Sequence, residues 1–133
     1  MREITDIPPG KLHKAGEDYL EAVLVLHKKR GIVRSVDVAR HLNISKPSVS
    51  NAVSILQQAG YLTMDSDHFL HLTEVGQKIA ERIYERHVFF MELLIDVGVD
   101  PETAEADACK MEHAVSAESF EKLKQARQRL WKK

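Results

Sequence analysis

The segment Cys109–His113 contains a thiol, a carboxylate and an imidazole, carried by Cys109, Glu112 and His113. These side chains stand at positions i, i+3 and i+4, which share one face of a helix. A thiolate, a carboxylate and an imidazole on one patch are donors suited to a transition metal. The alternative is a surface Glu–His pair beside a buried cysteine, since single cysteines usually behave as small core residues.

Length and composition indicate a globular chain of 133 residues, with one domain or a small domain joined to a helical extension. Its single cysteine excludes an internal disulfide framework. The N-terminus shows no basic region followed by an apolar run, and no stretch approaches the roughly 18 apolar residues of a membrane span. We therefore expect a cytoplasmic protein that does not enter a membrane.

The net charge of −1 hides an asymmetry along the chain. Residues 28–51 contain six basic side chains and one acid, Asp37, whereas residues 92–107 contain six acids and no Lys or Arg. This pattern favours an anionic partner near the first segment and a cation near the second, although ordinary solvated faces would explain it equally well.

The elements before the Cys109 segment predict a DNA-reading module. A first helix should run from about residue 11 to 30, with Tyr19, Ala22, Val23, Leu26 and possibly Leu12 as its apolar stripe and Gly31 as its stop. A short second helix opens with Ser35 as N-cap, and a third begins at Lys46 or Pro47 and ends near Gly60. Two helices joined by a tight turn at residues 43–45 form a helix-turn-helix pattern.

Short polar side chains at the start of the third helix would allow close approach to base edges and phosphates, although a plain solvent face would look the same. The expected DNA contacts, with Arg34 and Arg40 as phosphate candidates, are Arg34, Ser35, Arg40, Lys46, Pro47, Ser48, Ser50 and Asn51.

Two short strands, 61–63 and 69–72 around a turn at 65–68, would turn this motif into a winged helix. A long helix from about 74 to 97, capped by Thr73, should pack into a dimer or bundle. The next helix opens at Asp100 and Pro101 and carries the Cys109 segment; the last, Ala117–Trp131, is capped by Ser116. The predicted fold is mainly α with a small β-hairpin wing: a winged helix-turn-helix domain at 1–73, then a helical metal-binding and dimerisation domain at 74–133.

With these elements in order, the chain resembles the diphtheria-toxin-repressor family of metal-dependent bacterial regulators, in a short form similar to the manganese-transport regulators. The resemblance covers about residues 14–116. It rests on the segments Glu17–Glu21, Ser45–Ser50, Leu72–Gly76, Arg86–His87 and Cys109–His113.

The resemblance implies a metal site made of Asp18, Glu21, His87, Cys109, Glu112 and His113. Cys109 stands where the manganese branch has a glutamate, and Asp18 where the iron branch tends to have a methionine. The iron branch's ancillary site needs a Glu and a His where this chain has Met91 and Glu105, so no ancillary site of that form is expected. Carboxylates and imidazoles suit Mn²⁺ or Fe²⁺, while a thiolate favours Fe²⁺, Co²⁺ or Zn²⁺ and could reduce a two-metal site to one.

The implied function is a homodimeric repressor of manganese or iron homeostasis. It would bind double-stranded operator DNA when metal joins the DNA-reading module to the dimerisation helices. One alternative is a metal-independent winged-helix regulator that senses another ligand. A small metalloenzyme is the other, but the sequence has no glycine-rich phosphate loop and no zinc-protease helix signature. We therefore expect no catalytic residues and no small organic substrate.

Overall fold

The computed structural model describes residues 14–131. The chain divides into two compact units, Met1–Arg82 and Ile83–Lys133, and each is described by itself. The segment 1–10 and the start of the first helix, at about residue 11, lie outside the described residues. The domain boundary at 73/74 stays a prediction.

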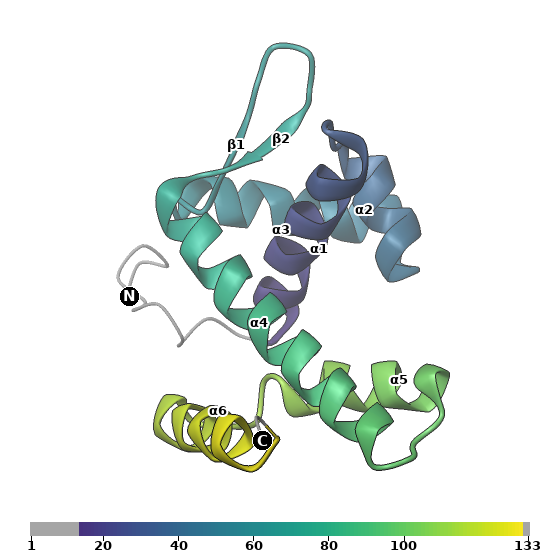
Figure 1. Cartoon of the computed structure of the whole chain (residues 1–133). Helices are drawn as coiled ribbons and strands as arrows, with labels where there is room; N and C mark the ends of the chain where they lie inside the picture. The colour runs from purple at the N-terminus through teal and green to yellow at the C-terminus, as the bar shows by residue number, and fades with distance from the viewer. Residues whose placement is uncertain (1–13, 132–133) are drawn as a thin grey trace. The chain divides into compact units, whose positions relative to one another are not determined.

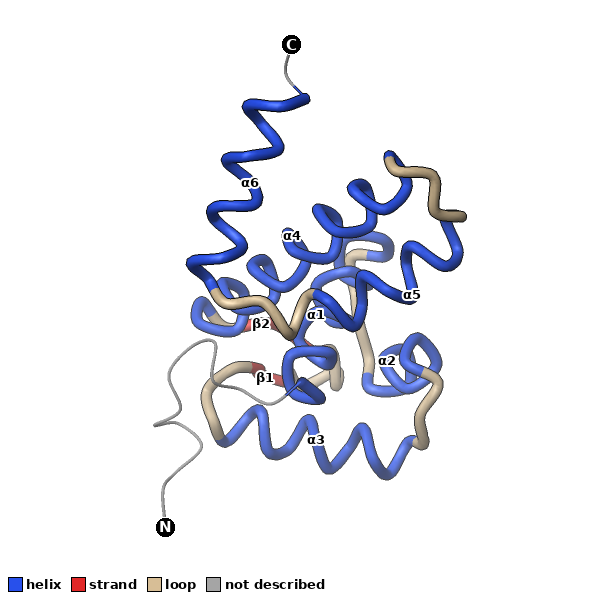
Figure 2. Tube along the Cα trace, turned by 90° about the horizontal axis from the view of Figure 1, so that it is seen from below, coloured by secondary structure: helices blue, strands red, loops and turns tan. Residues whose placement is uncertain are grey.

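The first unit has the order of a winged helix-turn-helix, as predicted (Figure 1). Three helices are followed by an antiparallel hairpin, and the tube in Figure 2 shows the loops that connect them. The elements are α1 (Lys14–Arg30), α2 (Ser35–Leu42), α3 (Lys46–Gln58), β1 (Leu62–Met64), β2 (Leu70–Leu72) and the first turns of α4 (Glu74–Asp96).

Helix α1 is the centre of the first unit's core. Ala22, Val23 and Leu26 of the predicted stripe are buried, and so are Leu20 and Leu24, which the prediction left out. The stripe is wider than one helical face because α1 contacts α2, α3 and β2. Gly31 ends the helix with a φ of 81°, as expected for a left-handed stop.

The start of α2 differs by one residue from the prediction. Arg34, not Ser35, is the N-cap, and the Asp37 carboxylate accepts a hydrogen bond from the Arg34 N–H at 2.9 Å. Asp37 is the third residue of the helix, so its side chain can reach back to the cap as in a capping box. The capping interaction with Asp37 therefore starts the helix one residue before the N-cap predicted at Ser35.

Helix α3 begins at Lys46, with Ser45 as N-cap and Pro47 in its first turn. The Ser45 hydroxyl accepts the Ser48 N–H at 3.2 Å. Val49, Val53 and Leu56 are buried, and Ala52 is half-buried.

The hairpin pairs Leu62 with Leu72, Thr63 with His71 and Met64 with Leu70. Strand β1 lies one residue later than the predicted 61–63, and β2 starts one residue later than predicted but ends at 72 as expected. The turn at 65–68 is confirmed. The Asp65 carboxylate closes that turn by accepting the N–H groups of Asp67 at 2.9 Å and Phe69 at 3.0 Å.

Thr73 precedes α4 and connects it to the end of α3. Its hydroxyl donates to the Gly60 carbonyl at 2.7 Å and accepts the Gly76 N–H at 3.1 Å. Gly76 lies so close to the chain that a Cβ on it would stand 2.1 Å from the Tyr61 carbonyl oxygen. Glycine is required here by this close backbone approach.

The second unit contains the rest of α4, then α5 (Pro101–Met111) and α6 (Ala117–Trp131). Phe90, Ala108 and Phe120 form its buried cluster. Asp100 caps α5 and Ser116 caps α6, through hydrogen bonds from the N–H groups of Glu102 and Ser119. None of the helices in residues 14–131 combines the length and apolarity that a membrane crossing requires.

The end of α5 corrects one prediction. The helix stops at Met111, so Glu112 is its C-cap and His113 lies in the following turn. Glu112 nevertheless keeps helical dihedral angles, and its N–H bonds to the Ala108 carbonyl at 3.0 Å. Its side chain therefore still projects on the face that carries Cys109.

Candidate functional site

His87 on α4 lies against Cys109 and Glu112 at the end of α5. Its Nδ1 is 3.1 Å from Oε2 of Glu112 and 3.7 Å from Sγ of Cys109. One ligand atom from each of the three side chains lies within 4.8 Å of the other two. The donors are therefore close enough for one cation to contact all three.

Glu112 is the buried centre of this cluster, with no exposed surface. Besides its contact with His87, its Oε1 is 3.3 Å from Nε2 of His113. A buried carboxylate is costly unless cationic or hydrogen-bonding groups compensate it. Two imidazoles beside one carboxylate are such groups, and they also leave a set of metal donors in one place.

Arg86 holds the turn that presents Glu112 and His113. It is itself buried, and its guanidinium donates to the backbone carbonyls of Glu112, at 3.2 Å, and of Val115. The same guanidinium lies over the Phe120 ring, 5.2 Å from its centroid. In the sequence, only the adjacency of Arg86 to His87 indicates that Arg86 lies near the cluster, and it does not predict this positioning role.

The protonation of His87 depends on the same neighbours. Hydrogen bonds to Cys109 and then to Glu112 raise the pKa of His87 to about 10, against the opposing effect of its partial burial. The imidazole is therefore protonated at neutral pH and stabilises the cluster as a cation. A metal ion has to take the place of that proton.

The donor set fits a divalent transition metal. Imidazole and carboxylate suit Mn²⁺ and Fe²⁺, and the thiolate of Cys109 adds a softer donor that suits Fe²⁺, Co²⁺ or Zn²⁺. Of the six predicted ligands, His87, Cys109 and Glu112 thus come together in the second unit. His113 contacts the other carboxylate oxygen of Glu112.

The other two predicted ligands, Asp18 and Glu21, belong to α1 of the first unit. They stand three residues apart and are both partly buried. Nζ of Lys14 lies 3.0 Å from Oδ2 of Asp18, an ion pair that a metal at Asp18 would have to compete with. Their membership of the metal site stays a prediction.

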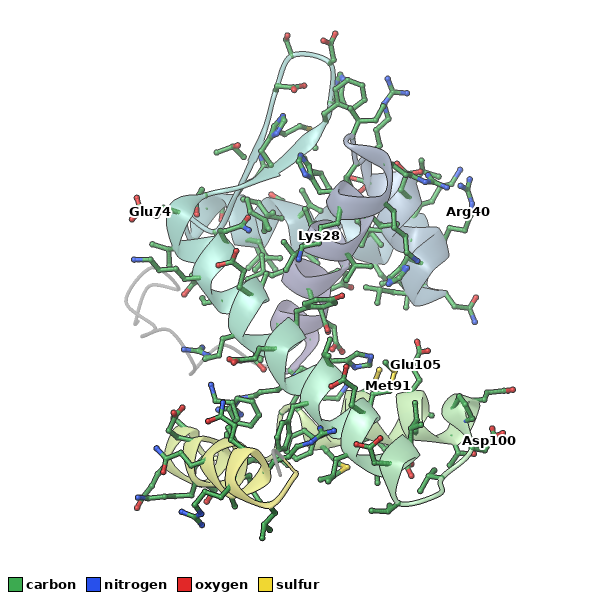
Figure 3. All side chains as sticks on the ribbon, viewed as in Figure 1. Lys28, Arg40, Glu74, Met91, Asp100 and Glu105 are labelled. Carbon is green, nitrogen blue, oxygen red and sulfur yellow. The ribbon has the colours of Figure 1, made fainter. Side chains whose placement is uncertain are left out.

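Met91 lies on α4 and Glu105 on α5 (Figure 3). These are the two positions where the resemblance to the iron branch would place an ancillary site. Glu105 is exposed and Met91 half-buried. A thioether and one exposed carboxylate are a poor pair of ligands for Mn²⁺ or Fe²⁺. No ancillary site of that form is proposed.

The predicted DNA-contacting residues all lie on or beside α2 and α3. Ser35 is partly buried, and the other members are exposed: Arg34, Arg40, Lys46, Pro47, Ser48, Ser50 and Asn51. Arg40, labelled on α2 in Figure 3, lies 3.8 Å from Asp37, and the Ser48 hydroxyl is 2.8 Å from that of Ser45. Sequence reasoning missed Ser45 and Asp37 as the groups that fix the two helix starts.

Comparison with known proteins covers both units. Residues 11–68 match the family model described as the iron dependent repressor N-terminal DNA binding domain. Residues 73–130 match that of the iron dependent repressor metal binding and dimerisation domain.

Curated relatives cover most of the chain. An uncharacterised HTH-type transcriptional regulator of Methanocaldococcus jannaschii is 35% identical over 113 residues, which are 81% of this chain and 88% of the relative. The transcriptional regulator MntR of Escherichia coli O6:H1 is 36% identical over 105 residues, 79% of this chain and 68% of that protein.

Solved structures agree with these relatives. The manganese regulator SloR matches with a TM-score of 0.74 and 25% identity, over 83% of this chain and 52% of that one. IdeR of T. acidophilum matches with a TM-score of 0.66 and 26% identity, over 80% and 50%. The chain spans about half the length of these two structures. With both of its family models matched in order, this chain belongs to the iron-dependent repressor family of transcriptional regulators.

Proposed function

We propose that this protein is a cytoplasmic, metal-dependent repressor of manganese or iron homeostasis. Two copies form a homodimer that binds double-stranded operator DNA when Mn²⁺ or Fe²⁺ is available. The proposal includes no catalytic step and no small organic substrate. One observation carries it: within a metal-binding and dimerisation domain, His87, Cys109 and Glu112 bring three donor atoms within 4.8 Å of one another.

A bound cation would compensate the negative charge of the ligand residues. A bound divalent cation would supply the positive charge that holds several anionic side chains at one point. His87 would ligate it from α4 and Cys109 from α5. Glu112 and His113 would ligate it from the turn that follows α5, where Arg86 keeps Glu112 in place. In the apo protein, the protonated His87 is the cation beside Glu112.

Asp18 and Glu21 complete the proposed ligand set from α1. By ligating the same cation, they would restrict the DNA-reading module relative to the dimerisation helices. A two-fold dimer reads half-sites about one helical turn, ~34 Å, apart, so such a restriction would favour the DNA-competent state. The metal ion would act through its higher affinity for the DNA-competent state.

The experiment begins by selecting duplexes from a random library with the full chain under anaerobic conditions, in separate selections with Mn²⁺, Fe²⁺, Co²⁺ and Zn²⁺. Fluorescence anisotropy then measures the affinity of a selected duplex against Mn²⁺, Fe²⁺, Co²⁺ and Zn²⁺, with and without chelator. Glu112→Ala should abolish the metal-dependent gain, because it removes the buried carboxylate of the cluster. Glu118→Ala is the matched control, since Glu118 is an exposed carboxylate on α6.

Specific binding that persists in chelator would overturn the metal requirement and favour a regulator of another ligand. Failure to select any duplex under every metal would overturn DNA recognition itself. Asp18→Ala and Glu21→Ala test the remaining ligands: unchanged metal affinity in both would remove α1 from the proposed site.

A further inference from the structure

The tip of the hairpin wing is acidic. Asp65 and Asp67 lie in the turn, and the Asp65 carboxylate contacts Nε2 of His71 at 2.8 Å besides capping the turn. Hydrogen bonds from His71 and from the backbone hold the pKa of Asp65 below its usual value. DNA phosphates repel such a tip, and among residues 65–68 there is no Lys or Arg.

Directly after this tip, Phe69 lies against the start of α2. Its half-buried ring stands under the guanidinium of Arg34, with Cζ 4.7 Å from the ring centroid. Arg34 itself is exposed and is one of the phosphate candidates. A guanidinium within about 6 Å of an aromatic centroid is attracted to the ring face.

The backbone on both sides of this contact is fixed. The Leu70 N–H donates to the Val33 carbonyl at 2.7 Å, which joins the residue after Phe69 to the residue before Arg34. The Arg34 N–H donates to Asp37, whose other oxygen accepts Nη1 of Arg30 at 2.9 Å. With the backbone held, the freedom left at Arg34 is that of its side chain, and the ring limits it.

We propose that Phe69 is a positioning residue, which holds the Arg34 guanidinium for contact with a DNA backbone phosphate. The inference rests on the proposed function and gives the wing a specific part in it. A guanidinium can stack its face on an aromatic ring while its edge keeps N–H donors for a phosphate. The wing then raises DNA affinity through Arg34 while its acidic tip makes no phosphate contact.

The test is a double-mutant cycle with the full metal-loaded chain and a selected duplex. Phe69→Leu keeps an apolar side chain but removes the ring face, and should weaken DNA binding about two- to tenfold, because binding must then order one long side chain that the ring had already held. Arg34→Ala should weaken it further and reduce the salt dependence by about one phosphate contact. In the Arg34→Ala background, Phe69→Leu should have no additional effect. Phe69→Tyr should bind DNA with the same affinity as the wild type, because it keeps an aromatic ring under Arg34.

Met64→Leu is the control for a general disturbance of the hairpin, since Met64 is a half-buried β1 residue. The free protein gives a second measurement that needs no variant. The Arg34 Nε–H proton should show an upfield ring-current shift in NMR spectra, and Phe69→Tyr should retain it.

Phe69→Leu that weakens binding equally with and without Arg34 would overturn the inference, as would an unshifted Arg34 Nε–H signal. In either case metal-dependent DNA binding by the wild type would still stand. A wild-type chain that selects no duplex would instead remove the proposed function, and this inference with it.

Discussion

At the scale of single residues, the carboxylate of Glu112 can be buried because neighbouring groups compensate its charge. A fully buried carboxylate is expected only where partners compensate its charge, and here the imidazoles of His87 and His113 lie 3.1 and 3.3 Å away. The same arrangement brings donors together for a cation. The cluster can therefore be stable without metal, and a metal ion could still replace the proton on His87.

Cys109 should set the metal preference. Cys109→Glu replaces a soft donor with a hard one, so the affinity for Zn²⁺ and Co²⁺ should fall by at least about tenfold while that for Mn²⁺ is kept. Competition with a metal-binding dye measures the affinities. The thiolate-to-cobalt absorption band should disappear as well.

Cys109→Ser is the control for the loss of sulfur at nearly constant size, and it should lose the same absorption band. Equal Zn²⁺ affinity in wild type and Cys109→Glu would show that the thiol is no ligand.

His87 should make metal binding depend on pH. Its pKa is raised to about 10 in the folded apo protein, so below that pH the imidazole holds a proton that a metal must displace. Metal affinity should therefore rise as pH increases from neutrality toward 10. The opposite holds for the apo fold: His87 stabilises it fully below its unfolded pKa, near 6.5, and this contribution is lost as pH rises through about 10.

Calorimetry of Mn²⁺ binding in buffers of different ionisation enthalpy measures the protons released. His87→Gln should release one proton fewer than wild type, while His68→Gln, at an exposed turn position, should change nothing. Equal release in wild type and His87→Gln would contradict the assignment.

At the scale of elements, Gly76 allows the start of α4 to lie directly against the backbone of Tyr61. Gly76→Ala would bring a Cβ to within 2.1 Å of a backbone oxygen, which cannot move as a flexible side chain could. Overpacking of this kind costs about 1–3 kcal/mol, so the free energy of unfolding should fall by that amount. Urea denaturation measures it.

Val75→Ala is the adjacent control, because Val75 is 45% exposed and its truncation should change stability little. Equal stability of Gly76→Ala and wild type would show that the backbone approach relaxes without cost.

Most elements could be predicted from local signals, although the N-cap of α2 and the end of α5 each lie one or two residues earlier than predicted. Thr73, Asp100 and Ser116 act as predicted because a cap needs only the residues beside it. The burial of Leu20 and Leu24 could not be read from one helix, since it depends on α2, α3 and β2 around α1.

The candidate site divides in the same way. The spacing of Cys109, Glu112 and His113 showed that they could share a face, although α5 ends before Glu112. That His87 joins them came only from the family resemblance, because local spacing says nothing about contacts 22 to 25 residues apart. The support from Arg86 is equally non-local.

At the scale of the whole molecule, DNA affinity must come from a local concentration of charge, because the net charge is −1. We expect the basic side chains of the helix-turn-helix to supply it. Lys46→Ala should weaken binding to all duplexes and reduce the slope of log affinity against log salt by about one unit. Anisotropy titrations at several salt concentrations measure the slope.

Lys122→Ala removes an exposed lysine of α6, outside the DNA-binding family match, and serves as the control. An unchanged slope in Lys46→Ala would indicate that the start of α3 does not approach the phosphates.

The graded exposure of the three clustered donors also implies an order in time. Cys109 is exposed, the His87 side chain is 14% exposed and Glu112 is fully covered. At the proposed site, an incoming ion would therefore meet sulfur first and the carboxylate last. The thiol would then govern how fast metal is captured, and Glu112 how long it stays. Stopped-flow capture of Co²⁺ should be slowed in Cys109→Ala, whereas Glu112→Gln should mainly hasten release to a chelator. How quickly a cell responds to a brief rise in metal would depend on the rate of capture, and how long the response lasts would depend on the rate of release.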